Sequence, residues 1–74
     1  MNIPKIFHKQ MNLSQKEIKI LKLLILGLEN TEIAEQMGIT VHTVKVHITS
    51  ILKKFNAKNR TQAACLAIKK GLID

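Results

Sequence analysis

Acidic residues are scarce in this 74-residue chain. It contains 12 Lys and Arg but only 5 Asp and Glu, which gives a formal net charge of +7. No carboxylate side chain occurs between Glu35 and Asp74. A positive excess of this size in so short a chain favours a polyanionic partner, either nucleic acid or a membrane surface, although some small proteins are simply basic.

Cysteine and aromatic residues are also nearly absent, with one Cys, no Trp or Tyr and two Phe. A lone Cys65 excludes an intrachain disulfide and a cysteine-based zinc finger, and it fits a reducing cytoplasm. No apolar run is long enough to span a membrane, and the first residues lack the apolar core of a signal peptide. The length allows one small domain with a core built mostly from Ile and Leu.

The pattern of a catalytic or metal site is missing. The few carboxylates are scattered, and His42 and His47 are too far round a helix to act as i, i+4 metal ligands. There is no Gly-rich phosphate-binding loop. We therefore expect no enzyme activity, no catalytic residue, no metal site, no cofactor and no small-molecule ligand.

Capping signals divide the chain into helices and short turns. Ser14 and Glu17 form a capping-box pattern, and Asn59 and Gln62 form a second one. Gly27 is placed to end a helix. The sequence predicts a compact all-α domain with helices at about residues 15–26, 31–37, 41–55 and 60–70.

The stretch 41–55 organises the rest of the chain. Thr40 is a good N-cap, and no Gly or Pro interrupts the next fifteen residues. Four apolar side chains fall within roughly 60° of a helical wheel; they are Val44, Ile48, Ile51 and Phe55. The opposite face carries no acid, and its residues are His42, Lys45, Val46, Thr49, Ser50 and Lys53. Such a face is suited to meet an anion.

A shorter helix precedes this one and is closed by Gly38, which favours the left-handed conformation. Two helices joined by a short Gly-containing turn form a helix-turn-helix, here at about residues 28–47. In that motif the second helix enters the major groove of DNA.

Residues 13–73 resemble the LuxR-type helix-turn-helix domain, which is also the effector domain of FixJ/NarL-type response regulators. The matching residues are Leu13-Ser14, Lys16-Glu17, Ile20-Leu21, Gly27, Asn30, Glu32-Ile33-Ala34, Ile39-Thr40, Thr43-Val44-Lys45-Val46-His47, Ile51, Lys54 and residues 59–64. Phe55, Asn56 and Ala57 depart from the family pattern, although Asn56 tolerates a positive φ and can still end the long helix. The resemblance implies a bacterial, cytoplasmic, nucleoid-associated transcription regulator that binds double-stranded DNA in a sequence-specific manner.

Three residues are the expected contacts to DNA bases. Lys45 can donate to guanine O6 and N7, Val46 can contact a thymine methyl group, and Thr49 can bond to a base or a phosphate. In the family resemblance these positions face the base edges. The alternative for Val46 is a singly exposed apolar residue without a function.

Contacts to the DNA backbone or flanks are expected from Thr40, His42, Thr43, His47 and Lys53. His47 lies at the edge of the groove-facing side, and a packed, hydrogen-bonded His is an equal alternative. The first twelve residues form a basic arm, which either reaches along DNA or is a frayed terminus.

The helix at 60–70 is apolar on two sides. Ala63, Leu66 and Ala67 form one stripe, which the family's signature Ala63 places inward. The second stripe is the expected interface of a homodimer, and it comprises Thr61, Cys65, Ile68 and Leu72. The alternative is that both stripes belong to the core.

The resemblance also implies an ion pair between Arg60, the only Arg, and Glu17. A second hypothesis for the whole chain is a protein-binding module resembling sigma-factor region 4, with RNA polymerase as its partner. The initiating Met and the N-terminal arm favour a complete small regulator over an excised effector domain.

Overall fold

The computed structural model describes residues 12–71, and within that range every regular element is a helix. The helices are α2 (Gln15–Ile25), α3 (Asn30–Met37), α4 (Val41–Phe55) and α5 (Arg60–Lys69). The predicted all-α class is confirmed. Helices α2 and α5 each end one residue earlier than predicted, and α3 begins one residue earlier. The predicted arm, apart from Asn12, and Leu72 lie outside the described residues.

Helix α2 begins with the predicted capping box. The Ser14 hydroxyl accepts from the Glu17 backbone N–H at 3.0 Å, and Glu17 Oε1 accepts from the Ser14 N–H at 2.8 Å. Two of the backbone donors that a helix leaves unpaired at its start are satisfied in this way.

Helices α3 and α4 both end in a left-handed residue, as predicted. Gly38 has φ 68°, and the next amide, from Ile39, donates to the Ala34 carbonyl at 3.0 Å. Asn56 has φ 53°, and the Ala57 amide donates to the Leu52 carbonyl at 2.9 Å. This is the Schellman arrangement, which satisfies the last carbonyls of the helix while reversing the chain.

Helix α5 begins differently from the prediction in one respect. The Asn59 side chain accepts from the Gln62 N–H at 2.8 Å, as expected of an N-cap. The Gln62 side chain, however, accepts from the Lys58 N–H at 2.6 Å and not from that of Asn59. Gln62 therefore fastens the turn before α5, and the predicted reciprocal box is only half formed.

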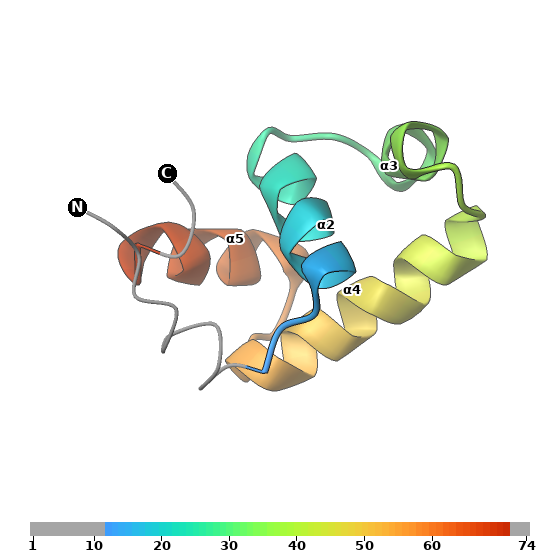
Figure 1. Cartoon of the computed structure of the whole chain (residues 1–74). Helices are drawn as coiled ribbons and strands as arrows, with labels where there is room; N and C mark the ends of the chain where they lie inside the picture. The colour runs from blue at the N-terminus through green and yellow to red at the C-terminus, as the bar shows by residue number, and fades with distance from the viewer. Residues whose placement is uncertain (1–11, 72–74) are drawn as a thin grey trace.

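The four helices pack around one core, with α4 as the central support. Helix α2 lies against α4 and α5, while α3 packs on the N-terminal half of α4 (Figure 1). The buried apolar residues are Ile20, Leu21, Leu24, Ile33, Ala34, Val44, Ile48, Ile51, Phe55, Ala63 and Ala67. Fully burying one of the larger side chains contributes about 1.5–3 kcal/mol.

The rotation of α2 buries Ile20 in preference to Ile18, although both are apolar. Ile18 is only half-buried, whereas Ile20 is fully buried. Apolar residues occur on most sides of α2, so their spacing alone did not fix its rotation.

Candidate nucleic-acid interface

The packing of α3 on α4 fixes which side of α4 faces outward. The four residues predicted to point inward from α4, at positions 44, 48, 51 and 55, are all buried. Ala34 of α3 is also buried, and its small side chain allows the two helices to approach closely. The remaining face of α4 is therefore turned to solvent.

That outward face carries the three residues predicted to contact bases. Lys45 and Thr49 are exposed, and Val46 is 53% exposed. His42 and Lys53 are also exposed at the two ends of the same helix. Thr40 is exposed as well, whereas Thr43 and His47 are half-buried. This surface contains a shallow hollow, which is lined by Val46, Thr49, Ser50 and Lys53.

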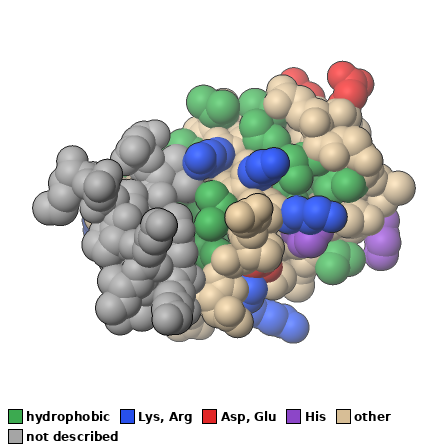
Figure 2. Space-filling view, in the orientation of Figure 1, with side chains coloured by type: hydrophobic (Ala, Val, Ile, Leu, Met, Phe, Trp, Pro, Cys, Tyr) green, Lys and Arg blue, Asp and Glu red, His purple; other side chains and the backbone are tan. Residues whose placement is uncertain are grey.

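Charge is divided between the two helices of the motif. Glu29, Glu32 and Glu35 are exposed at the start of α3 and along it. In Figure 2 acidic side chains gather at the upper right, where α3 lies, and the histidines lie below them along α4. An approaching polyanion is therefore attracted to α4 and repelled from the outer side of α3.

The hydroxyls of Thr40, Thr43 and Thr49 already have partners within the protein. The Thr40 hydroxyl accepts from the Thr43 N–H at 3.1 Å and so caps α4, as predicted. The Thr49 hydroxyl donates to the Lys45 carbonyl at 2.9 Å. In this rotamer Thr49 presents an acceptor to an incoming group, because its proton is directed back along the helix.

Ser50 was predicted to lie on the outward face, but it is half-buried at the edge of that face and its hydroxyl turns inward. Its hydroxyl donates to Glu17 Oε2 at 2.6 Å. Lys54 Nζ donates to Glu17 Oε1 at 2.7 Å and to the Asn12 carbonyl at 2.7 Å. Glu17 is almost fully buried, with 3% of its surface exposed. This network joins the start of α2 to the C-terminal half of α4.

The network also determines the ionisation of Glu17. Burial alone raises the pKa of a carboxyl, but hydrogen bonds from Lys54, Ser50 and the Ser14 backbone outweigh it. Together with the charge of Lys54 they lower the pKa of Glu17 from its usual 4.5 to about 2. Glu17 is therefore charged at neutral pH and holds α4 in place through its charge.

The expected ion pair between Arg60 and Glu17 is wrong. Glu17 pairs with Lys54, while the Arg60 guanidinium donates to the Asn30 side-chain oxygen and, at 2.7 Å, to the Leu28 carbonyl. Asn30 is the first residue of α3, and Leu28 lies in the connection between α2 and α3. Arg60 therefore reaches across from the first turn of α5 to the helix-turn-helix. The family resemblance shows which positions match but not which side chains contact one another, so it did not reveal this partner.

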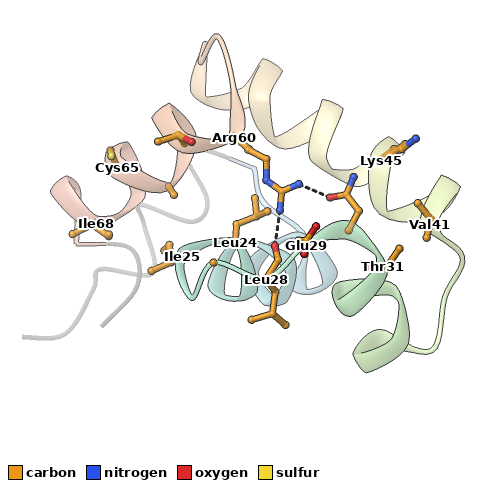
Figure 3. A pocket seen from close by; sticks show the side chains of 14 residues that line it. Leu24, Ile25, Leu28, Glu29, Thr31, Val41, Lys45, Arg60, Cys65 and Ile68 are labelled. Atoms are coloured by element: carbon orange, nitrogen blue, oxygen red, sulfur yellow. Dashed lines mark hydrogen bonds between the residues drawn. The ribbon is translucent and has the colours of Figure 1, made fainter.

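Helix α5 has one inward and one outward apolar stripe, as predicted. Ala63 and Ala67 are fully buried, and Leu66 packs against the core. Thr61 and Cys65 are exposed, and Ile68 is 56% exposed. Beside this outer stripe runs an open groove of mixed character (Figure 3). Its lining combines apolar side chains, among them Leu24, Ile25 and Ile68, with the charged side chains of Glu29, Lys45 and Arg60.

Within residues 12–71, no three His, Cys, Asp or Glu side chains lie close enough together to hold a metal ion. None of the described helices has both the length and the apolar character needed to cross a membrane.

Comparison with known proteins agrees with this architecture. Residues 11–67 match the family model of the bacterial regulatory proteins of the luxR family. The chain is 44% identical over 63 residues to the transcriptional regulatory protein LiaR of Bacillus subtilis, covering 85% of this chain and 30% of that protein. It is 42% identical over 62 residues to the oxygen regulatory protein NreC of Staphylococcus carnosus, covering 84% of this chain and 29% of that protein. It is 43% identical over 61 residues to the response regulator protein VraR of Staphylococcus aureus, covering 82% of this chain and 29% of that protein.

The fold and the family match define the class as DNA-binding transcription regulators with a helix-turn-helix, which is not an enzyme class. The chain belongs to the luxR family of bacterial regulatory proteins. It spans less than a third of the length of the curated relatives it matches.

Proposed function

We propose that this domain binds double-stranded DNA in a sequence-specific manner, with α4 lying in the major groove. The supporting observation is the exposed, acid-free face of α4, where Lys45, Val46 and Thr49 stand together on the outer side of a helix-turn-helix. A major groove about 12 Å wide admits one helix in this orientation. The domain would act in the bacterial cytoplasm, on the nucleoid.

Lys45, Val46 and Thr49 are the proposed base contacts. The Lys45 ammonium donates to guanine O6 and N7, and Val46 packs against a thymine methyl group. Because the Thr49 hydroxyl donates to the Lys45 carbonyl, it is left to accept from the amino group of adenine or cytosine. The three side chains together favour a mixed site over a uniform A·T or G·C tract.

Backbone contacts would set the register of α4 in the groove. Lys53 neutralises a phosphate at the far end of the exposed face, while Thr40, Thr43 and the first amides of α4 meet another at its N-terminus. His42 is exposed near that same end, and His47 is half-buried at the edge of the face. These contacts contribute affinity without distinguishing sequences.

A homodimer through the outer stripe of α5 would place two copies of α4 in successive major grooves. Thr61, Cys65 and Ile68 provide the described part of this surface, and Leu72 would extend it. Exposed apolar surface that continues into a groove is the usual property of an association site. Ile68 is 56% exposed, so burying the exposed part of two copies would contribute about 2–3 kcal/mol. This is less than the cost of association, so the dimer would form chiefly on DNA, where both copies are already bound.

Selection of bound sequences from random duplex DNA tests the central part of the proposal. We expect enrichment of one short site, and of pairs of that site at a fixed spacing near one or two helical turns. Recovery of unenriched DNA at near-physiological salt would contradict sequence-specific binding. Enrichment of single sites without any preferred spacing would contradict the dimer and leave DNA readout intact.

The salt dependence of binding separates DNA recognition from the alternative, a protein-binding module of the transcription machinery. The open groove beside α5, with exposed Ile68 at its edge, is the observation that supports this alternative. If about six phosphates are contacted, log K should fall against log salt with a slope of about −5. A purified protein partner held in the groove would show a much shallower dependence.

The single native cysteine gives a direct test of the dimer. Cys65 is exposed on the outer stripe of α5. In a two-fold dimer the two copies of Cys65 approach each other, so mild oxidation in the presence of the two-site duplex should yield a covalent dimer. The Cys65→Ser variant is the control. Equal cross-linking on single-site and two-site DNA would speak against an ordered dimer.

A further inference from the structure

Arg60 joins three parts of the fold with one side chain. The residue belongs to the first turn of α5, and its guanidinium donates to the Asn30 side chain and to the Leu28 carbonyl (Figure 3). These partners lie thirty and thirty-two residues away in the sequence.

The packing of the helices gives this contact its importance. Helix α3 packs chiefly on α4, whereas α5 packs on α2 and α4. The DNA-reading pair α3–α4 and the outer face of α5 therefore meet mainly through the shared support of α4. Arg60 adds a polar link that bypasses α4 and ends on Asn30, where α3 begins.

The chemistry of the link favours a fixed geometry. A guanidinium is planar, and its N–H groups point in set directions, so two of them can hold two acceptors at once. Here Nη1 and Nη2 each have their own acceptor, and the group is partly buried. The Leu28 carbonyl is unable to bond within a helix, because it lies between α2 and α3. Loss of Arg60 would leave that carbonyl without this donor, and it would free the connection to move.

We infer that Arg60 is a positioning residue that fixes the orientation of the helix-turn-helix relative to the outer face of α5. The inference rests on the proposed function, in which α5 forms the dimer interface and α4 contacts the DNA. In such a dimer, the angle between α5 and the α3–α4 pair sets the distance between the two reading helices. Arg60 then determines which half-site spacing the dimer accepts, although it touches neither the DNA nor the partner.

The test uses duplexes that carry one copy of the selected half-site, or two copies at spacings stepped by one base pair. Arg60→Met keeps most of the aliphatic stem and removes both hydrogen bonds, and Arg60→Lys retains the charge but is unable to hold both acceptors. Lys58→Met is the charge control, because it removes one exposed positive charge from the turn just before α5 and leaves Arg60 in place. Asn30→Ala removes one of the two acceptors and leaves Arg60 in place.

We expect all variants to bind the single half-site within about threefold of the unaltered chain, after the loss of charge is corrected with Lys58→Met. The preference for the best spacing over its neighbours should fall about tenfold in Arg60→Met and in Arg60→Lys, a typical size for coupling between two parts of a protein. Asn30→Ala should cause a smaller loss, and the double variant should lose no more than Arg60→Met alone.

Two other outcomes are distinguishable from this one. If the unaltered chain shows no preferred spacing, the dimer proposal fails and the inference fails with it. If the unaltered chain prefers one spacing and Arg60→Met keeps that preference, or loses single-site and two-site affinity equally, the positioning role of Arg60 is contradicted while the dimer stands. Should Arg60→Met fail to fold by circular dichroism, Arg60→Lys and Asn30→Ala decide by the same criterion.

Discussion

The charge on Glu17 makes the stability of this domain depend on pH in a predictable way. The carboxylate is almost fully buried, and its pKa is lowered from 4.5 to about 2. In the unfolded chain Glu17 takes up a proton near its usual pKa, whereas in the folded chain it stays ionised to about pH 2. Its contribution is therefore complete above about pH 5 and is lost as the pH falls from about 5 to about 2.

The size of this contribution follows from the two pKa values. Lowering the pKa from 4.5 to about 2 corresponds to about 3 kcal/mol, at about 1.4 kcal/mol for each pH unit. The side chain of Glu17 is 4% exposed, so solvent screens the pair with Lys54 only weakly. For a domain of this length, about 3 kcal/mol is a large share of the total stability.

Urea unfolding at pH 6, 4 and 3 measures this effect, with far-UV circular dichroism as the signal because the chain contains no Trp or Tyr. At pH 6 the free energy of unfolding of Glu17→Gln should be about 3 kcal/mol lower than that of the unaltered chain. At pH 3 this difference should be smaller. Glu35→Gln, which removes an exposed carboxylate, should leave the pH dependence unchanged. The reasoning would be refuted if the difference in unfolding free energy between Glu17→Gln and the unaltered chain stayed constant from pH 6 to pH 3.

Three further predictions concern other parts of the fold. Ile51 is fully buried, so Ile51→Ala should lower the free energy of unfolding by about 2–5 kcal/mol and Ile51→Val by about 1 kcal/mol. If urea unfolding shows that the two variants lose the same free energy of unfolding, the central packing of Ile51 is contradicted. Gly38→Ala should cost about 1–2 kcal/mol through φ 68° alone, because a Cβ there meets no atom within 4 Å; Gly38→Asn should cost less, and the same denaturation assay compares them. Ile68→Asp should leave stability within about 0.5 kcal/mol yet remove the preference for two half-sites over one in a titration with labelled DNA; unfolding of this variant would place Ile68 in the core.

The sequence predicted best where one regular pattern governs one helix. Val44, Ile48, Ile51 and Phe55 repeat at helical spacing, and a single face of α4 is apolar, so both its burial and its exposed side follow from spacing alone. The left-handed ends at Gly38 and Asn56 were also predictable, because few residues tolerate that backbone conformation.

Prediction failed where a side chain depends on how separate elements meet. Arg60 was assigned to Glu17, but its partners are set by the path of the connection between α2 and α3, which no local pattern encodes. Ser50 counts as an outward residue on a helical wheel, yet it turns to Glu17 once α2 has packed on α4. The rotation of α2 was ambiguous because Ile18 and Ile20 are equally apolar.

The most direct test of base readout by α4 compares Lys45→Ala with Lys53→Ala on the selected site and on a shuffled duplex of the same composition. Each variant removes one exposed positive charge from the same helix, so the general electrostatic loss is matched. Lys45→Ala should lose about 1–3 kcal/mol on the selected site and much less on the shuffled duplex, whereas Lys53→Ala should weaken both about equally. If Lys45→Ala also weakens both duplexes equally, Lys45 contacts a phosphate, and the proposed readout of bases by this face of α4 is contradicted.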